Sequence, residues 1–164
     1  MKSSLIIIAC LCAIAFAVLP AEALTMKTLT INLEDDGDAQ VDLRYDLSLP
    51  EQGAVMFQIT DLRGTLERDL QQNLNRPVSV RSAGMDSANI TIAGLASVST
   101  REGATVVTMP GFSLANAESV MKQYWYAPLT SPDFSPEVTA ITFPDGYTEY
   151  YYNQIHFPTI TRTL

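Results

Sequence analysis

The sequence has few cysteine and histidine residues, and their scarcity excludes several kinds of site. It contains two cysteines, Cys10 and Cys12, and one histidine, His156. Both cysteines lie in an N-terminal segment that we expect to be removed, so the mature chain has no thiol for a disulfide, a nucleophile or a metal ligand. One histidine without cysteine cannot build a His/Cys metal site, and we interpret His156 as a surface or structural residue. The sequence therefore predicts no metal site.

Recognisable catalytic motifs are also missing. The chain has no Gly-x-Ser-x-Gly, His-Glu-x-x-His, Walker or Gly-x-Gly-x-x-Gly sequence, and these motifs mark the common nucleophile, zinc and nucleotide sites. We therefore expect no cofactor and favour a non-enzymatic protein. A hydrolase that uses carboxylates alone remains the alternative, because a catalytic carboxylate pair can come from separate strands.

Positive charge is sparse and scattered. Ten lysines and arginines stand against 18 aspartates and glutamates, which gives a net charge of −8. Nucleic-acid binding needs clustered basic side chains that neutralise phosphates, so we expect no nucleic-acid partner. The acidity favours solubility and opposes adhesion to anionic lipid.

The sequence has one long apolar run, from Leu5 to Leu19. The run is shorter than the about 18 residues of a typical membrane span. It follows a short basic start and precedes Pro20 and the small-x-small pattern Ala21–Ala23, which is typical of a signal-peptidase site. We predict that residues 1–23 are a cleaved signal peptide. Residues 24–164 would then form a single secreted or cell-surface domain without an integral membrane span.

Two alternatives for the N-terminus stay open. The apolar run could remain attached as an uncleaved anchor. Ile7–Cys10 also resembles a bacterial lipobox, but the apolar stretch before Cys10 is shorter than the about 7–15 residues that such a signal needs.

Alternating apolar and polar residues predict an antiparallel hairpin at the start of the mature chain. Leu29, Ile31 and Leu33 alternate with polar residues, and the same period recurs from Ala39 to Leu47. A period of two indicates strands with one buried and one solvent-exposed face. The acidic segment Glu34–Asp38 contains an Asp-Gly pair that suits the connecting turn.

A helix and a second hairpin complete the expected fold. Leucines at every fourth position predict an amphipathic helix over Leu62–Leu74. A shorter helix is expected from Leu114 to Tyr124, with Ser113 as its N-cap. Pro144-Asp145-Gly146 predicts the turn of a C-terminal hairpin. Further strands are expected over 78–80, 88–92 and 105–109. The pattern as a whole predicts an α+β fold, with a mainly antiparallel sheet built from hairpins and one or two packed helices.

Aromatic residues are the most suggestive feature for function. We select five as candidates for binding a protein or glycan partner: Trp125, Tyr147, Tyr150, Tyr151 and Tyr152. In a strand, Tyr150 and Tyr152 share one face, and Tyr147 and Tyr151 share the other. An exposed row of tyrosines suits a partner. The alternative is that these side chains fill the core.

Two further motifs have both a functional and a structural interpretation. Asn89-Ile90-Thr91 is a glycosylation sequon, which an exported chain can use. The carboxylates of Glu34–Asp38 could offer oxygen ligands to a hard cation, but they lack calcium-loop spacing. We interpret that acidic segment as a solvated turn.

The chain resembles a group of uncharacterised exported proteins of methanogenic archaea. Three segments carry the resemblance: Trp125–Leu129, Phe143–Tyr147 and Ile155–Pro158. The group has no assigned activity, so the resemblance implies no functional residue. It implies an archaeal cell-envelope setting.

Overall fold

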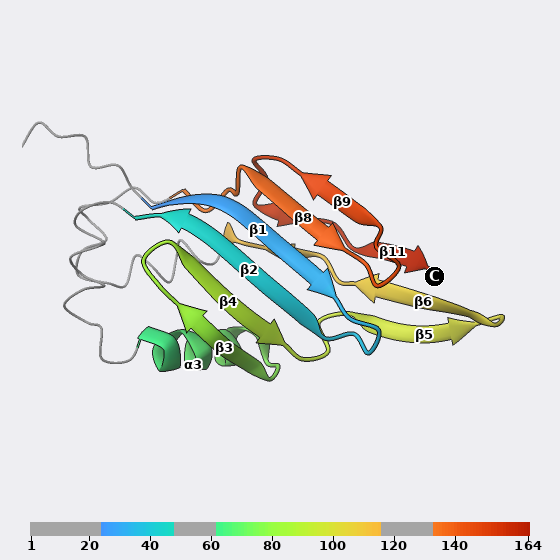
Figure 1. Ribbon diagram of the computed structural model, residues 1–164. Helices are drawn as coiled ribbons and strands as arrows, with labels where there is room; N and C mark the ends of the chain where they lie inside the picture. The colour runs from blue at the N-terminus through green and yellow to red at the C-terminus, as the bar shows by residue number, and fades with distance from the viewer. Residues whose placement is uncertain (1–23, 48–61, 116–132) are drawn as a thin grey trace, which may run out of the picture.

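A computed structural model of the chain describes residues 24–47, 62–115 and 133–164 (Figure 1). The predicted signal peptide 1–23, Trp125 and most of the predicted helix 114–124 lie outside these residues. The described elements are β1 (Thr25–Leu33), β2 (Ala39–Asp46), α3 (Leu62–Leu74), β3 (Val78–Ala83), β4 (Ser87–Ile92), β5 (Ser97–Arg101), β6 (Ala104–Met109), β7 (Phe112–Ser113), β8 (Val138–Thr142), β9 (Thr148–Tyr151), β10 (His156–Phe157) and β11 (Ile160–Thr163).

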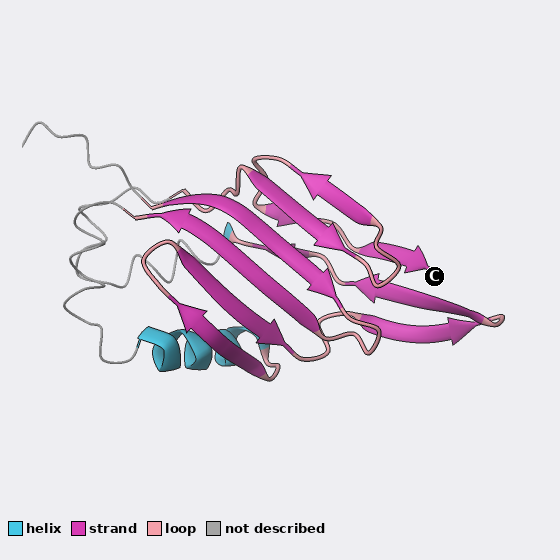
Figure 2. Ribbon diagram, in the orientation of Figure 1, coloured by secondary structure: helices cyan, strands magenta, loops and turns pink. Residues whose placement is uncertain are grey.

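The expectation of an α+β fold is wrong, because the molecule is mostly β (Figure 2). Strands β1–β11 form several sheets, whereas α3 is the one helix with both ends in the described part of the chain. Helix α3 lies beside the edge strand β3 and forms no layer of its own. The physical reason is that the buried face of the main sheet is covered by a second sheet, so a helical layer is not needed.

The main sheet has six strands in the order β3-β4-β2-β1-β8-β9. The predicted β1–β2 hairpin is confirmed, with Ile31 opposite Val41 and a turn at Glu34–Asp38. The β8–β9 hairpin is confirmed as well, and the strands expected over 78–80 and 88–92 pair with each other as β3 and β4. Strands β1 and β8 pair in parallel, whereas the other four ladders of this sheet are antiparallel.

A second layer packs behind the main sheet (Figure 1). It contains the three-stranded sheet β11-β6-β5, next to the short β10-β7 pair. Val107 and Met109 of β6 and Ile160 of β11 belong to the same buried cluster as Leu29 and Ile31 of the main sheet. The hydrophobic core therefore lies between two sheets, as in a β-sandwich.

Helix α3 protects the β3 edge with polar as well as apolar contacts. The Glu67 carboxylate accepts the amide N–H of Val80 at 2.9 Å, and the Gln71 amide donates to the Val78 carbonyl at 2.8 Å. Leu70 packs against the core, whereas Leu74 is 38% exposed at the end of the helix. The row of leucines at every fourth position of the helix thus contacts the core at Leu70 and is exposed to solvent at Leu74. No helix in the described ranges is long and apolar enough to cross a membrane.

Candidate functional site

The C-terminal hairpin closes through the predicted turn. The Phe143 amide donates to the Tyr147 carbonyl at 2.8 Å, and the Gly146 amide donates to the Phe143 carbonyl at 2.9 Å. Gly146 has φ +84°, a left-handed conformation that glycine adopts without side-chain strain. Phe143 is almost fully buried and anchors the turn in the core. The strand that follows, β9, is therefore held in a defined register.

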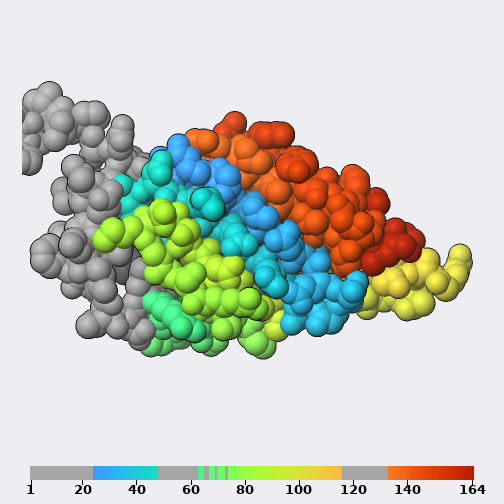
Figure 3. All heavy atoms as spheres, viewed as in Figure 1, coloured from blue at the N-terminus to red at the C-terminus, as the bar shows by residue number. Residues whose placement is uncertain are grey.

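The two faces of β9 carry different tyrosines, as the alternation predicts. Tyr151 lies opposite the buried Thr139, and Tyr150 lies opposite Ala140 on the outer face. Tyr150 and Tyr152 are each 60% exposed. Figure 3 shows the β8–β9 hairpin, in orange, along one long side of the molecule. Two large aromatic side chains thus project from the edge of the main sheet into solvent.

Tyr151 is held on the inner face by neighbouring side chains. Its hydroxyl donates to the Glu149 carboxylate at 2.7 Å, and its ring meets the Phe157 ring edge-on at 5.6 Å. Phe157 in turn stacks on Phe112 at 4.4 Å. Burial first, and then the hydrogen bond and charge of Glu149, raise the pKa of Tyr151 to about 12. This tyrosine acts as a packing residue.

Tyr147 lies under Arg162, which no sequence pattern marked as a site residue. The Arg162 guanidinium is 3.9 Å from the centre of the Tyr147 ring, and its Nε donates to the Asp145 carboxylate at 2.7 Å. Burial raises the pKa of Asp145, but hydrogen bonds from the Tyr147 amide and from Arg162 outweigh it and hold the pKa below its usual range. Arg162 ties β11 to the hairpin turn. No sequence motif signals this contact, because it depends on where β11 pairs.

The five candidate aromatics therefore do not form one surface. Tyr150 and Tyr152 face outward, Tyr151 packs inward, and Tyr147 is 42% exposed beneath Arg162. Trp125 lies outside the described residues. Tyr150 and Tyr152 present flat apolar rings with hydroxyl groups, a combination that can pack on a partner and form hydrogen bonds with it.

Asn89 lies on the outer face of β4, between β3 and β2. Its side-chain amide nitrogen donates to the Asp42 carboxylate at 2.5 Å. A glycan would be attached at that nitrogen in place of one of its two hydrogens. Glycosylation of Asn89 stays a prediction.

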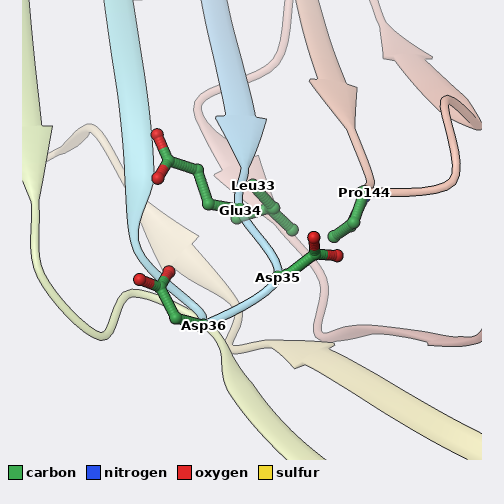
Figure 4. A pocket seen from close by; sticks show the side chains of 5 residues that line it. All are labelled: Leu33, Glu34, Asp35, Asp36 and Pro144. Carbon is green, nitrogen blue, oxygen red and sulfur yellow. The ribbon is translucent and has the colours of Figure 1, made fainter.

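The acidic segment after β1 forms an ordered turn beside a shallow hollow of about 430 Å³ (Figure 4). The Asp35 carboxylate lies next to Pro144, whereas Glu34 accepts a hydrogen bond from Gln40 at 2.8 Å. Asp38 accepts the Gly94 amide at 2.7 Å. Glu34 and Asp38 thus hold the turn to Gln40 of β2 and to Gly94 after β4. Across the described ranges, no three His, Cys, Asp or Glu side chains are close enough to hold a metal ion.

The hydrolase alternative needs a carboxyl group whose pKa is raised, so that it can donate a proton at neutral pH. Asp145 and Asp133 both have a lowered pKa; for Asp133 the cause is hydrogen bonding from the Ser135 hydroxyl and amide. Neither residue is suited to act as a general acid. His156 is exposed on β10.

Comparison with known proteins assigns no family. The chain matches no protein-family model, no curated protein and no solved structure. The functional proposals therefore rest on the residues and their geometry.

Proposed function

We propose that this chain is an exported, non-enzymatic domain of the cell envelope or the secreted space. Its role is to bind a protein or glycan partner through the surface formed by Tyr150 and Tyr152. The export part of the proposal rests on the predicted signal peptide 1–23.

One observation carries the binding proposal: Tyr150 on the edge strand β9 and Tyr152, which follows its last residue, are each 60% exposed. A tyrosine ring that is exposed to water adds little to the stability of the fold, and tyrosine is enriched where proteins bind partners. The neighbouring Tyr151 is packed inside, so the strand does not need these two rings for its own burial.

The test uses two panels of probes, an array of polysaccharides and a displayed library of random peptides. The unaltered chain should bind probes in at least one panel. The double variant Tyr150→Ser/Tyr152→Ser should lose at least tenfold in affinity, because interface tyrosines often contribute more than about 1 kcal/mol. Met85→Ser is the matched control, since Met85 is also exposed, at 42%, but lies at the β3–β4 turn.

Equal binding by the double variant and by the chain with Met85→Ser would overturn the proposal. Thermal unfolding of all three proteins accompanies the binding measurement, so that loss of folding is not mistaken for loss of a contact.

A further inference from the structure

The main sheet ends in two edge strands, and the fold treats them differently. At β3, the outward Val80 amide and Val78 carbonyl are bound by Glu67 and Gln71 of helix α3. A register shift between Val80 and Ser82 also bends this edge. Covering helices and bulges are two means by which proteins prevent an edge from pairing with another chain.

Within residues 24–47, 62–115 and 133–164, the β9 edge has neither protection. Its ladder with β8 is regular from Thr148 to Tyr151, and β8 is its one ladder partner within the described part of the chain. The strand contains no lysine or proline. Its one charged residue, Glu149, faces inward and accepts the hydrogen bond of Tyr151. An open and regular edge without an outward-facing charged side chain is a template for strand addition.

Two hydrogen bonds show which backbone groups point away from β8. Beside the turn, the Tyr147 carbonyl accepts the Phe143 amide, and beyond the strand the Asn153 amide donates to the Pro136 carbonyl. In an antiparallel ladder, alternate residues bond to the neighbour and the residues between them point away. Thr148 and Tyr150 therefore direct their N–H and C=O groups outward.

The residues with outward backbone groups are the same ones whose side chains lie on the outer face. A strand added beside β9 would hydrogen-bond to Thr148 and Tyr150, and its side chains would lie next to the two exposed tyrosines. We propose that β9 accepts an extended polypeptide segment as a seventh strand of the main sheet. This inference rests on the proposed function and names its partner as a protein segment.

Charge defines the partner further. The chain has a net charge of −8. A second copy or an acidic segment is therefore repelled, whereas a segment with flanking lysines or arginines is attracted. Next to Tyr150 and Tyr152 the segment presents apolar or β-branched side chains at alternate positions, because these pack well on aromatic rings across strands. The occupant is thus a basic, extended segment with an alternating apolar pattern.

The experiment distinguishes the contribution of the β9 backbone to binding from that of the tyrosine side chains. Peptides of 12 residues are selected on the full chain from a displayed random library, synthesised, and titrated against four variants. Thr148→Pro removes an outward N–H and keeps both tyrosines, and Thr148→Val keeps that N–H. Thr100→Pro makes the same change on β5, the exposed edge strand of the other sheet. Tyr150→Ser/Tyr152→Ser removes the side chains.

We expect the selected peptides to be basic and alternating. Thr148→Pro should weaken their binding at least tenfold, while Thr148→Val and Thr100→Pro bind as the unaltered chain does. In the unaltered chain, the peptide should slow hydrogen exchange at the Thr148 and Tyr150 amides. That measurement needs no variant, so it decides the question even if Thr148→Pro fails to fold.

Four results would overturn strand addition. These are a failure to select any peptide, selected peptides that are acidic, unchanged exchange at Thr148 and Tyr150, or a dimer of the chain alone that Thr148→Pro dissociates. If the chain binds glycans, and this binding is lost in the double tyrosine variant but unchanged in Thr148→Pro, strand addition is rejected and the proposed function still holds. Binding that is unchanged in the double tyrosine variant would reject the proposed function itself.

Discussion

Replacing Tyr151 with serine should destabilise the domain far more than replacing Tyr150 with serine. Truncation of a fully buried aromatic side chain costs about 3–5 kcal/mol. Tyr151 is half-buried, so about half of that cost applies, and its edge-on contact with Phe157 at 5.6 Å adds about 0.5–1.5 kcal/mol. We therefore expect a loss of about 2–4 kcal/mol for Tyr151→Ser.

Tyr150→Ser removes a ring that is 60% exposed, and we expect a loss below about 1 kcal/mol. Urea unfolding followed by circular dichroism at neutral pH measures both values, and equal m-values for the two variants would show that the denatured states are comparable. If the two substitutions destabilise the domain equally, the assignment of Tyr151 to the inner face and of Tyr150 to a free outer face is refuted.

Three further predictions address the turns, the pH dependence and the N-terminus. Gly37→Ala should lower the free energy of unfolding clearly more than Gly146→Ala does. Both glycines have positive φ, but a Cβ at Gly37 would meet the Ala96 carbonyl oxygen at 2.3 Å, whereas nothing lies within 4 Å of a Cβ at Gly146. Equal losses in urea unfolding would contradict the close approach at Gly37. The pKa of Tyr151 is about 12 and thus above its unfolded value of about 10, so its contribution to stability is present at neutral pH and is lost as the pH rises from about 10 to 12. Ultraviolet titration should show ionisation near the upper end of that interval that Tyr151→Phe reduces. Unchanged ionisation in Tyr151→Phe would mean that another tyrosine is responsible, such as Tyr45, whose pKa is also raised by burial. Intact mass of the exported protein should correspond to a chain that begins at Leu24, and a mass that includes Met1 would reject cleavage.

Local patterns predicted the hairpins because each depends on a few neighbouring residues. The alternation around Ile31 and Val41 and the turn at Gly37 define β1 and β2 without reference to the rest of the chain. The same holds for Pro144–Gly146 and the two faces of β9. Helix Leu62–Leu74 occupies the predicted range because its apolar period is local as well.

The sequence could not reveal contacts that depend on distant segments. The parallel pairing of β1 with β8 joins Ile31 to Ile141, and no local pattern encodes such a partner. Strands β5 and β11 were missed because one is wholly exposed and the other is short, so neither has a clear apolar alternation. Once β11 pairs with β6, the sheets form a sandwich and the helix becomes peripheral, which is why the α+β expectation failed.

The candidate site was predictable only in part for the same reason. The period of two separates Tyr150 from Tyr151, but it does not say which face is buried. That depends on Thr139 and Phe157, which come from other strands. The open edge of β9 is a property of the whole sheet order.

The most direct test of partner binding at the outer face of β9 is photo-crosslinking. A photoreactive phenylalanine analogue is placed at Tyr150, or at Met85 as the exposed control, in cells that export the chain. We predict one discrete adduct from the Tyr150 position and none from the Met85 position. Equal labelling from both positions, or no adduct from the Tyr150 position, would contradict a binding surface at Tyr150 and Tyr152.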